Sequence, residues 1–284
     1  MKNILVTGSK GQLGSELQFL SNDQNNFNFT FVDIKDLDIT NLENVIEFFT
    51  KEKFDYCINC AAYTAVDKAE SDQEVAYKVN VEGPRNLAIG SKINQTILFH
   101  ISTDFVFKGE SSTAYTENMS TSSLGIYGET KLKGEQAIAE EISSFYIIRT
   151  AWLYSSFGNN FVKTMLRLGR ERNELGVIVD QIGTPTYARD LAKVILAMID
   201  FDKENFGIYH YSNEGVASWY DFAKTIFAIK NIEVMVNPIP TSAYPTSAKR
   251  PSFSLLDKSK IKKIFNISIP YWQESLLNCL RLMD

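Results

Sequence analysis

The stretch "NILVTGSKGQLG" (residues 3–14) determines the fold class that the sequence predicts. A short apolar run ends at Gly8, and Gly11 and Gly14 follow at three-residue intervals as a helical pattern begins. Glycines at these places let the backbone turn tightly and approach a pyrophosphate, while the N-terminus of the next helix points at its charge. Turns also collect glycine, so the triplet alone is a weak signal. Its place between a first strand and a helix favours a dinucleotide site.

The alternation of strand and helix continues to about residue 155. Strand-like runs occupy 28–34, 55–62, 96–103 and 145–154, and helical patterns occupy 41–52, 73–93 and 128–141. This order predicts right-handed βαβ crossovers and a parallel sheet with helices on both faces. We therefore predict an α/β protein with a Rossmann-like doubly wound parallel sheet. Pro84 is expected to kink or divide the long helical pattern that contains it.

After residue 155 the pattern changes. Helical patterns at 159–171, 188–200 and 218–230 surround a strand-like run at 207–213, and most of the seven prolines follow residue 237. Loop-rich parts of this kind often cover a substrate. We expect a dinucleotide-binding domain over residues 1–155 and a smaller, mainly substrate-binding lobe over residues 156–284, with some segments crossing back.

The composition excludes several classes of protein. With 44% hydrophobic and 22% charged residues the chain is typical of globular proteins, and its net charge of −5 argues against nucleic acid as the main partner. No apolar run is long enough to span a membrane, and the N-terminal run is too short for a signal peptide. We expect a cytoplasmic protein with neither a membrane nor a nucleic-acid partner. A homodimer is compatible with the sequence, which leaves the oligomeric state open.

Cysteine and histidine do not indicate a metal site. Cys57 and Cys60 form a C-x-x-C pair, but on a strand this spacing points the side chains to opposite faces. We interpret both as buried apolar positions. The two histidines, His100 and His210, lie far apart in strand-like runs, and we interpret them as structural.

An acidic residue closes the second strand-like run. Asp33 stands where a carboxylate can accept hydrogen bonds from the adenosine ribose hydroxyls. The same charge would repel a 2′-phosphate, although Lys35 lies nearby. NADH is therefore slightly favoured as the cofactor, and NADPH stays open. The alternative interpretation is a turn or capping aspartate.

Two stretches carry groups suited to carbonyl chemistry. "HISTDFVF" (100–107) places Ser102, Thr103 and Asp104 at the end of a strand, where ligands of parallel sheets bind. "YGETKLKG" (127–134) places Tyr127 and Lys131 one helical turn apart. An ordinary helix surface with a solvated lysine would give the same spacing. The alternative is a phenol whose pKa the lysine lowers and which donates a proton as hydride reaches a carbonyl.

These motifs together resemble the extended short-chain dehydrogenase/reductase superfamily. Longer stretches are similar to its dTDP-4-dehydrorhamnose reductase family, from near residue 11 to beyond residue 250: "GQLGSEL", "NCAAYTAVDKAE", "STDFVFKG", "YGETKLKGE", "IIRTAWLY", "GNNFVKTMLRL", "DQIGTPTYARDLA" and "PTSAYPTSAKRPSFSLLD". The resemblance implies reduction of the 4-keto group of dTDP-4-dehydro-6-deoxy-L-mannose to dTDP-L-rhamnose. Thr103 would polarise the keto oxygen, Tyr127 would be the general acid, and Lys131 would lower its pKa and bind ribose.

The resemblance also implies binding positions beyond the catalytic set. Those expected to contact the cofactor, in addition to the three glycines, Asp33 and the Tyr–Lys pair, are Gln12, Leu13, Asp38, Ile39, Ala61, Ala62 and Tyr63. Those expected to contact the dTDP-sugar, in addition to Thr103, are Val66, Asp104, Phe105, Trp152, Asn160 and Arg250. The fork of Arg250 suits a diphosphate.

Two departures from the family pattern concern the catalytic helix and a metal. Residues 123–126 read Ser-Leu-Gly-Ile, without the proline and asparagine that often precede the tyrosine. Some members hold Mg²⁺ at a dimer interface. Glu16 matches one acidic position of that site, but Arg189 stands where another acid is expected, which argues against a metal-bridged dimer. We assign no metal ligands.

Four alternatives compete with the reductase. A nucleotide-sugar dehydratase needs an acid after Thr103-Asp104, where this chain has Phe105. A 4-epimerase, or another nucleotide-sugar 4-ketoreductase, stays open on local chemistry. A non-catalytic regulatory subunit with this fold is disfavoured because the catalytic set and glycine loop are intact. The sequence does not set the nucleotide or the product stereochemistry.

Overall fold

The computed structural model describes residues 1–201 and 204–283, and it is built around one six-stranded sheet. All six strands are parallel, in the order β10–β5–β4–β3–β1–β2. Their bounds are β1 Lys2–Thr7, β2 Phe27–Phe31, β3 Tyr56–Asn59, β4 Ile97–Thr103, β5 Phe145–Thr150 and β10 Gly207–His210. The chain reverses its order at β1, which lies between β2 and β3, so a ligand crevice is expected beyond the carboxyl ends of these strands.

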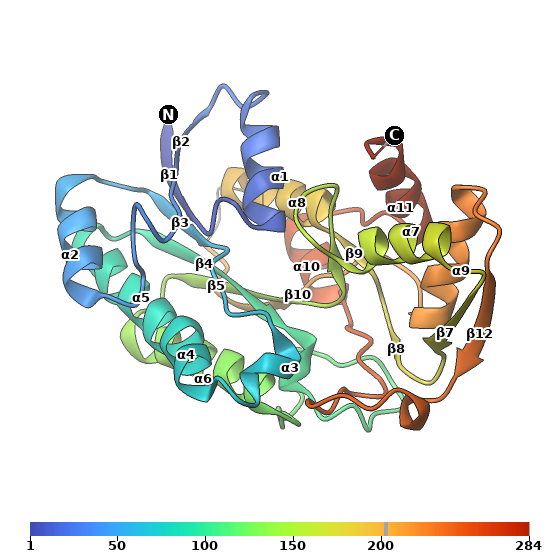
Figure 1. Cartoon of the computed structure of the whole chain (residues 1–284). Helices are drawn as coiled ribbons and strands as arrows, with labels where there is room; N and C mark the ends of the chain where they lie inside the picture. Colours follow the sequence, from blue (N-terminus) through green and yellow to red (C-terminus); the bar gives the residue numbers. More distant parts are fainter. Residues whose placement is uncertain (202–203, 284) are drawn as a thin grey trace.

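Helices cover both faces of the sheet (Figure 1). One face carries α2 (Leu42–Lys51), α5 (Gly83–Asn94) and α6 (Ile126–Glu141). The other carries α1 (Gln12–Ser21), α8 (Ala188–Asp200) and α10 (Ser259–Phe265). The predicted Rossmann-like α/β fold is therefore confirmed.

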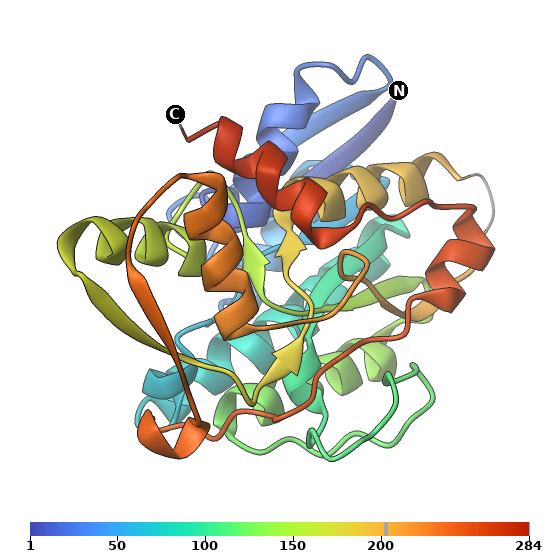
Figure 2. The same cartoon turned by 90° about the vertical axis from the view of Figure 1, so that its right-hand side faces the viewer.

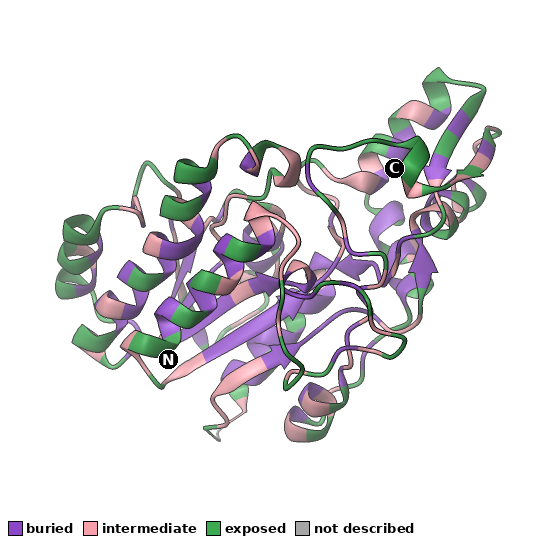
Figure 3. Cartoon of the chain, turned by 90° about the horizontal axis from the view of Figure 1, so that it is seen from below, coloured by how far each residue is buried: buried purple, intermediate pink, exposed green. Residues whose placement is uncertain are grey.

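Alternate residues of the strands build the two core layers. Ile4 and Val6 pack with Leu17 and the apolar side of α8, whereas Leu5 packs with Leu87 and the residues under α2. Figure 3 shows the central strands largely buried and the outward sides of the helices exposed. Burial on both faces explains why these strands read as continuous apolar runs.

Two segments with a continuous sequence pattern are interrupted in the structure. The long helical pattern is divided into α4 (Gln73–Tyr77), a π-helical turn (Lys78–Glu82) and α5, and Pro84 lies in the first turn of α5. The missing N–H of proline is tolerated there, and the expected division is confirmed. The expected strand 145–154 is wrong in its second half. β5 ends at Thr150, and a separate β6 (Leu153–Tyr154) follows Trp152, whose φ of 49° breaks the extended chain.

A second group of elements lies beside the carboxyl end of the sheet (Figure 2). It comprises α7 (Phe161–Glu171), β7 (Glu174–Ile178), α9 (Trp219–Ile229), β12 (Met235–Ile239) and α11 (Trp272–Arg281). These surround a core of their own, which includes Val162, Phe222, Ile226 and Leu276. Three short strands lie apart from the six-stranded sheet: β8 (Ile182–Gly183) pairs with β11 (Ala217–Ser218), and β9 (Thr186–Tyr187) pairs with β6.

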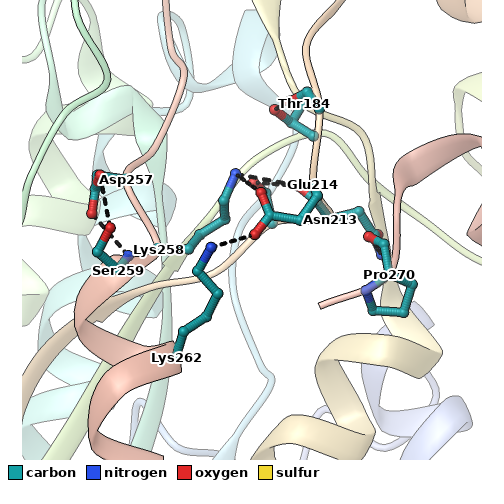
Figure 4. Close-up of polar contacts among 10 residues, drawn as sticks. Thr184, Asn213, Glu214, Asp257, Lys258, Ser259, Lys262 and Pro270 are labelled. Atoms are coloured by element: carbon teal, nitrogen blue, oxygen red, sulfur yellow. Dashed lines mark hydrogen bonds and ion pairs between the residues drawn. The ribbon is translucent and has the colours of Figure 1, made fainter. Parts of the chain in front are cut away.

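A partly exposed polar cluster connects the C-terminal segment to the loop that follows β10 (Figure 4). The Glu214 carboxylate lies 2.7 Å from Lys262 Nζ and 3.4 Å from Lys258 Nζ. Asn213 donates to the carbonyl of Pro270 at 3.3 Å. These contacts fix the path of the chain between α10 and α11. None of the helices in the described ranges is long and apolar enough to cross a membrane.

Candidate active site

The glycine loop forms a cradle that side chains would fill. Gly8 has a φ of +63°, and a Cβ there would lie 2.6 Å from the backbone nitrogen of Ala61. A Cβ on Gly14 would lie 2.5 Å from the carbonyl oxygen of Gly8. Gly11 precedes α1, whose N-terminal N–H groups have no side-chain cap. Free N–H groups and a tight backbone suit a pyrophosphate, so these residues fit a dinucleotide.

The residues expected at the adenosine end lie on the adjoining loop. Asp33 Oδ2 accepts from the backbone N–H of Lys10 at 3.1 Å, which places its carboxylate beside the glycine loop. Asp38 Oδ1 accepts from both the N–H and the hydroxyl of Thr40, at 2.9 and 2.8 Å. Ile39 is buried. Both acids therefore accept local hydrogen bonds, since Asp33 Oδ1 also accepts from the N–H of Ile34 at 2.8 Å, and Asp33 is distinguished by its contact with the glycine loop.

The segment after β3 forms one wall of the crevice. The backbone nitrogen of Ala61 lies against Gly8, and Ala62 lines the cavity described below. Tyr63 is held by Asn80, which accepts from its N–H at 2.9 Å, and its hydroxyl donates to Asp72 at 3.1 Å. The Tyr63 hydroxyl is thus directed to a surface carboxylate.

A cavity of about 610 Å³ opens at the carboxyl ends of β1, β3, β4 and β5. It brings together most of the site residues predicted from the sequence: Gly11, Gln12, Leu13, Ala62, Val66, Thr103, Asp104, Phe105, Tyr127, Lys131, Trp152, Asn160 and Arg250. The predicted residues outside its lining are Gly8, Gly14, Asp33, Asp38, Ile39, Ala61 and Tyr63. The first set surrounds the end of the crevice at which a nicotinamide and a substrate would meet.

Thr103 and Tyr127 adjoin at the centre of this cavity. Thr103 ends β4, where its Oγ1 accepts from the N–H of Phe105 at 3.2 Å and donates to Asp104 Oδ1 at 3.1 Å. The ring of Phe105 meets that of Tyr127 edge to face, with centroids 5.5 Å apart. Burial raises the pKa of Tyr127 to about 12, and a hydrogen bond with Thr103 opposes the rise. The phenol therefore keeps its proton at neutral pH, as a general acid must.

The position of Lys131 corrects one expectation. Its Nζ donates to the carbonyl of Ile101 at 2.6 Å and lies 3.2 Å from His100 Nε2. The expected lowering of the Tyr127 pKa by Lys131 is wrong for this arrangement, because burial raises that pKa and the amino group of Lys131 is directed to Ile101 and His100. Burial also lowers the pKa of Lys131 itself to about 8. Spacing along the helix predicts which face a lysine lies on, but not where its flexible end binds.

Ser102 lines the cavity, but its hydroxyl already donates a hydrogen bond to a protein partner. Its hydroxyl donates to Glu135 at 2.5 Å, and Glu135 forms a buried ion pair with Arg149 at 2.6 Å. Neighbouring residues of a strand point to opposite faces, so Ser102 and Thr103 could not both serve the substrate. No spacing in the sequence indicates this network, because Ser102, Glu135 and Arg149 lie on three different elements.

Asp104 is almost fully buried, and burial raises its pKa to about 6, against hydrogen bonds from Ser254 and Thr103. In the described part of the chain, its Oδ2 has no hydrogen-bond partner. A carboxyl group with a free acceptor beside Thr103 is compatible with the expected contact to a sugar hydroxyl.

Aromatic rings line the side of the cavity near α7 and α9. Trp152 stacks on Trp219, with centroids 3.7 Å apart and planes inclined by 10°. Asn160 caps α7 and donates to Gln12 Oε1 at 3.0 Å, which connects the glycine loop to this side. Trp219 was missed in the sequence because it lies 67 positions after its stacking partner.

A second cavity of about 600 Å³ continues from the first, and Arg250 lines both. The guanidinium of Arg250 pairs with Asp67, at 2.6 and 3.1 Å, next to Val66 at the start of α3 (Val66–Ala69). Arg167 and Arg172 also line the second cavity. A long anionic ligand could therefore extend from Tyr127 past Arg250.

The carboxylate of Glu16 has protein partners. It is fully buried, accepts from Arg189 Nε at 2.7 Å and accepts from Ser155 at 2.6 Å. Arg189 thus supplies the positive charge beside Glu16. Among the described residues no group of three or more His, Cys, Asp or Glu side chains could hold a metal ion.

Together, the parallel sheet, the glycine loop and the Tyr127–Lys131 pair in the crevice place the chain among the Rossmann-type proteins of the short-chain dehydrogenase/reductase superfamily. Comparison with known proteins narrows this class. The chain belongs to the family described as the RmlD substrate binding domain, whose model matches residues 1–284.

Named relatives agree with this assignment over nearly the whole chain. A dTDP-4-dehydrorhamnose reductase of Aggregatibacter actinomycetemcomitans is 41% identical, with 98% of each chain covered. The crystal structure of a dTDP-4-dehydrorhamnose reductase from Clostridium acetobutylicum is 43% identical, with 99% of each chain covered and a TM-score of 0.95. That of the Bacillus anthracis reductase, in complex with NADP, is 39% identical with the same coverage and a TM-score of 0.94.

Proposed function

We propose that this protein is an oxidoreductase that reduces the 4-keto group of dTDP-4-dehydro-6-deoxy-L-mannose to give dTDP-L-rhamnose, with NADH or NADPH as reductant. The observation that carries the proposal is the adjacent Thr103 and Tyr127 hydroxyls, which face a cavity beside the glycine loop. The identity of the substrate is inferred from the names of the relatives, which are about 40% identical over nearly the full length.

Each residue that lines the reacting end of the cavity has its own role in the proposed reaction. The reduced nicotinamide, when bound, supplies the hydride. Thr103 donates a hydrogen bond to the keto oxygen, for which its hydroxyl turns from Asp104 towards the substrate. Tyr127, protonated at neutral pH, gives its proton to the oxygen as negative charge develops there. The aromatic stack of Trp152 and Trp219 excludes water from the reacting face.

The second lobe would hold the nucleotide part of the substrate. The sugar would lie among Val66, Asp104, Phe105 and Trp152. The diphosphate would then pass Arg250, whose pairing with Asp67 is partly exposed and can be exchanged for a phosphate. We propose Arg250 as the main cation for this group.

We propose a preference for NADH that depends on Asp33. Asp33→Ala should weaken NADH binding roughly tenfold, because hydrogen bonds from ribose to a carboxylate are lost, and should weaken NADPH less. Fluorescence titration with both cofactors measures the ratio of their dissociation constants. Asp23→Ala, which removes the same charge from an exposed position after α1, is the control. An unchanged ratio in Asp33→Ala would remove Asp33 from the ribose role.

The reaction itself is tested by the loss of reduced-nicotinamide absorbance with purified protein and enzymatically generated dTDP-4-dehydrorhamnose, with the product identified by NMR. We expect the reduced nicotinamide to be oxidised and dTDP-L-rhamnose to be formed. Oxidation of the nicotinamide with formation of the 4-epimeric sugar would support the same mechanism with a different product. Cofactor binding without oxidation would overturn the proposal in favour of another nucleotide sugar or a regulatory role.

A further inference from the structure

A buried chain of hydrogen bonds runs behind the cavity, across three strands and one helix. Thr7 at the end of β1 donates to Asn59 Oδ1 at 2.8 Å, and Asn59 Nδ2 lies 3.0 Å from His100 Nδ1. His100 Nε2 in turn lies 3.2 Å from Lys131 Nζ. All four side chains are at most 1% exposed, so water does not substitute for these partners. His100 belongs to no part of the mechanism described above.

The hydrogen bonds of Asn59 determine which nitrogen of His100 carries the proton. The backbone N–H of Ala61 can only donate, and it donates to Asn59 Oδ1 at 3.1 Å. The amide of Asn59 is therefore oriented with its Nδ2 towards His100, and Nδ2 can also only donate. His100 Nδ1 must accept, so the single proton of the neutral imidazole is on Nε2. That N–H points at Lys131.

This tautomer distinguishes the two charge states of Lys131. An uncharged amine can accept from His100 Nε2–H while it donates to the carbonyl of Ile101. An ammonium has no lone pair and would meet the N–H of His100 donor to donor. The position behind the cavity is therefore favourable for the amine and unfavourable for the ammonium.

We propose that His100 is a positioning residue for Lys131: its Nε2–H holds the uncharged amine at the back of the cavity and disfavours that place for the ammonium, which is thereby directed forward, towards Tyr127 and the cofactor. The proposal rests on the proposed function only in naming the cofactor as the forward partner. It explains how a lysine that lies on the cavity wall can be withdrawn in the free protein.

The other groups that face Lys131 keep both charge states accessible. Burial lowers its pKa to about 8, whereas the charge of Glu135 on the same helix acts in the opposite direction. Cys60 after β3 also faces Lys131, but burial raises the pKa of its thiol to about 12, so it is uncharged near neutral pH. His100 itself stays neutral, because burial and the charge of Lys131 hold its pKa well below the ordinary value. With this pKa the ammonium is the major form at pH 7 and the amine the major form above about pH 8, while His100 is uncharged in both cases.

The first test needs no variant, because the chain has only two histidines. His210 Nδ1 lies 2.9 Å from the carbonyl oxygen of Tyr115, which can only accept, so His210 must be protonated at Nδ1. Two-bond ¹⁵N–¹H correlation spectra of the full-length protein should therefore show one histidine of each tautomer. Two histidines protonated at Nδ1, or a charged His100 at pH 7, would overturn the proposal.

The second test compares two variants that each keep one half of the imidazole. His100→Gln keeps an amide near Nε2, within reach of Lys131, whereas His100→Asn keeps an acceptor near Nδ1 for Asn59 and leaves nothing towards Lys131. The readout is the pH dependence of trace acetylation at Lys131, followed by peptide mass spectrometry in the absence of cofactor. This readout is independent of whether the protein reduces the proposed sugar.

Removal of the donor destabilises the uncharged amine, so the labelling midpoint should rise. We expect a rise of about one pH unit in His100→Asn, since a hydrogen bond of ordinary net strength corresponds to roughly a tenfold change in equilibrium. His100→Gln should stay close to the wild-type midpoint. Equal midpoints in wild type and His100→Asn, or equal shifts in both variants, would contradict the role. Melting temperatures of both variants report separately on folding.

Discussion

Replacement of Tyr127 by phenylalanine is expected to lower kcat by on the order of 10²–10⁴-fold, while the protein folds and binds its cofactor like the wild type. The phenol is the only acid that the proposed mechanism places on the keto oxygen. Burial raises its pKa to about 12, so it is protonated over the whole range in which the enzyme would work. The loss should fall on kcat because the proton is needed in the transition state and not for binding.

The control for Tyr127→Phe is the same substitution at a tyrosine whose hydroxyl takes no part in the proposed reaction. Tyr211 is fully buried, does not line the cavity, and its hydroxyl has no hydrogen-bond partner among the described residues. Tyr211→Phe removes the same atom from the core and should leave kcat and stability nearly unchanged. Stopped-flow measurement of a single turnover separates chemistry from product release. Full activity in Tyr127→Phe would remove Tyr127 from the role of general acid.

Much of the fold follows from short-range patterns. The alternation of Ile4, Leu5 and Val6 between two core layers is a property of any strand buried on both faces. The glycine loop is equally local, because the strain at Gly8 arises within a few residues of the turn and its nearest strand. Trp152 shows the limit: its positive φ interrupts an apolar run that otherwise reads as one strand.

The candidate site was predictable where one element supplies the geometry. Tyr127 and Lys131 lie on one wall of the cavity because a helical turn separates them. The direction of the Lys131 amine depends instead on Ile101 and His100, about 30 residues away, and no spacing rule predicts such a contact. The charged end of a long, flexible side chain binds the hydrogen-bond partners within its reach, which are set by the tertiary structure.

Arg149→Met should destabilise the protein by about 3–5 kcal/mol, because it leaves the buried carboxylate of Glu135 without its counterion. Both side chains are only 3% exposed, and Arg149 binds Glu135 through Nε and Nη2. Removal of Arg149 therefore leaves a charge in the core whose remaining hydrogen-bond partner, among the described residues, is the hydroxyl of Ser102. Urea unfolding, followed by circular dichroism, measures the loss.

A surface pair provides the matched control. Arg167 and Glu171 lie on α7 with an N–O distance of 2.7 Å, similar to the buried pair, but their side chains are 60% and 53% exposed. Arg167→Met should cost about 0.5 kcal/mol or less, because water solvates the remaining carboxylate. A similar cost for both substitutions would mean that the buried pair is not the origin of the effect.

The double variant Glu135→Leu/Arg149→Met distinguishes two origins of the lost stability: the net contribution of the ion pair, and the cost of burying one unpaired charge. Apolar side chains of similar volume in place of a buried pair are often neutral or stabilising, so most of the lost free energy of unfolding should return. Glu135 also lies one helical turn after Lys131 and raises its pKa. If stability returns in the double variant but the pKa of Lys131 falls, the buried pair is retained for the electrostatics of the site and not for the fold.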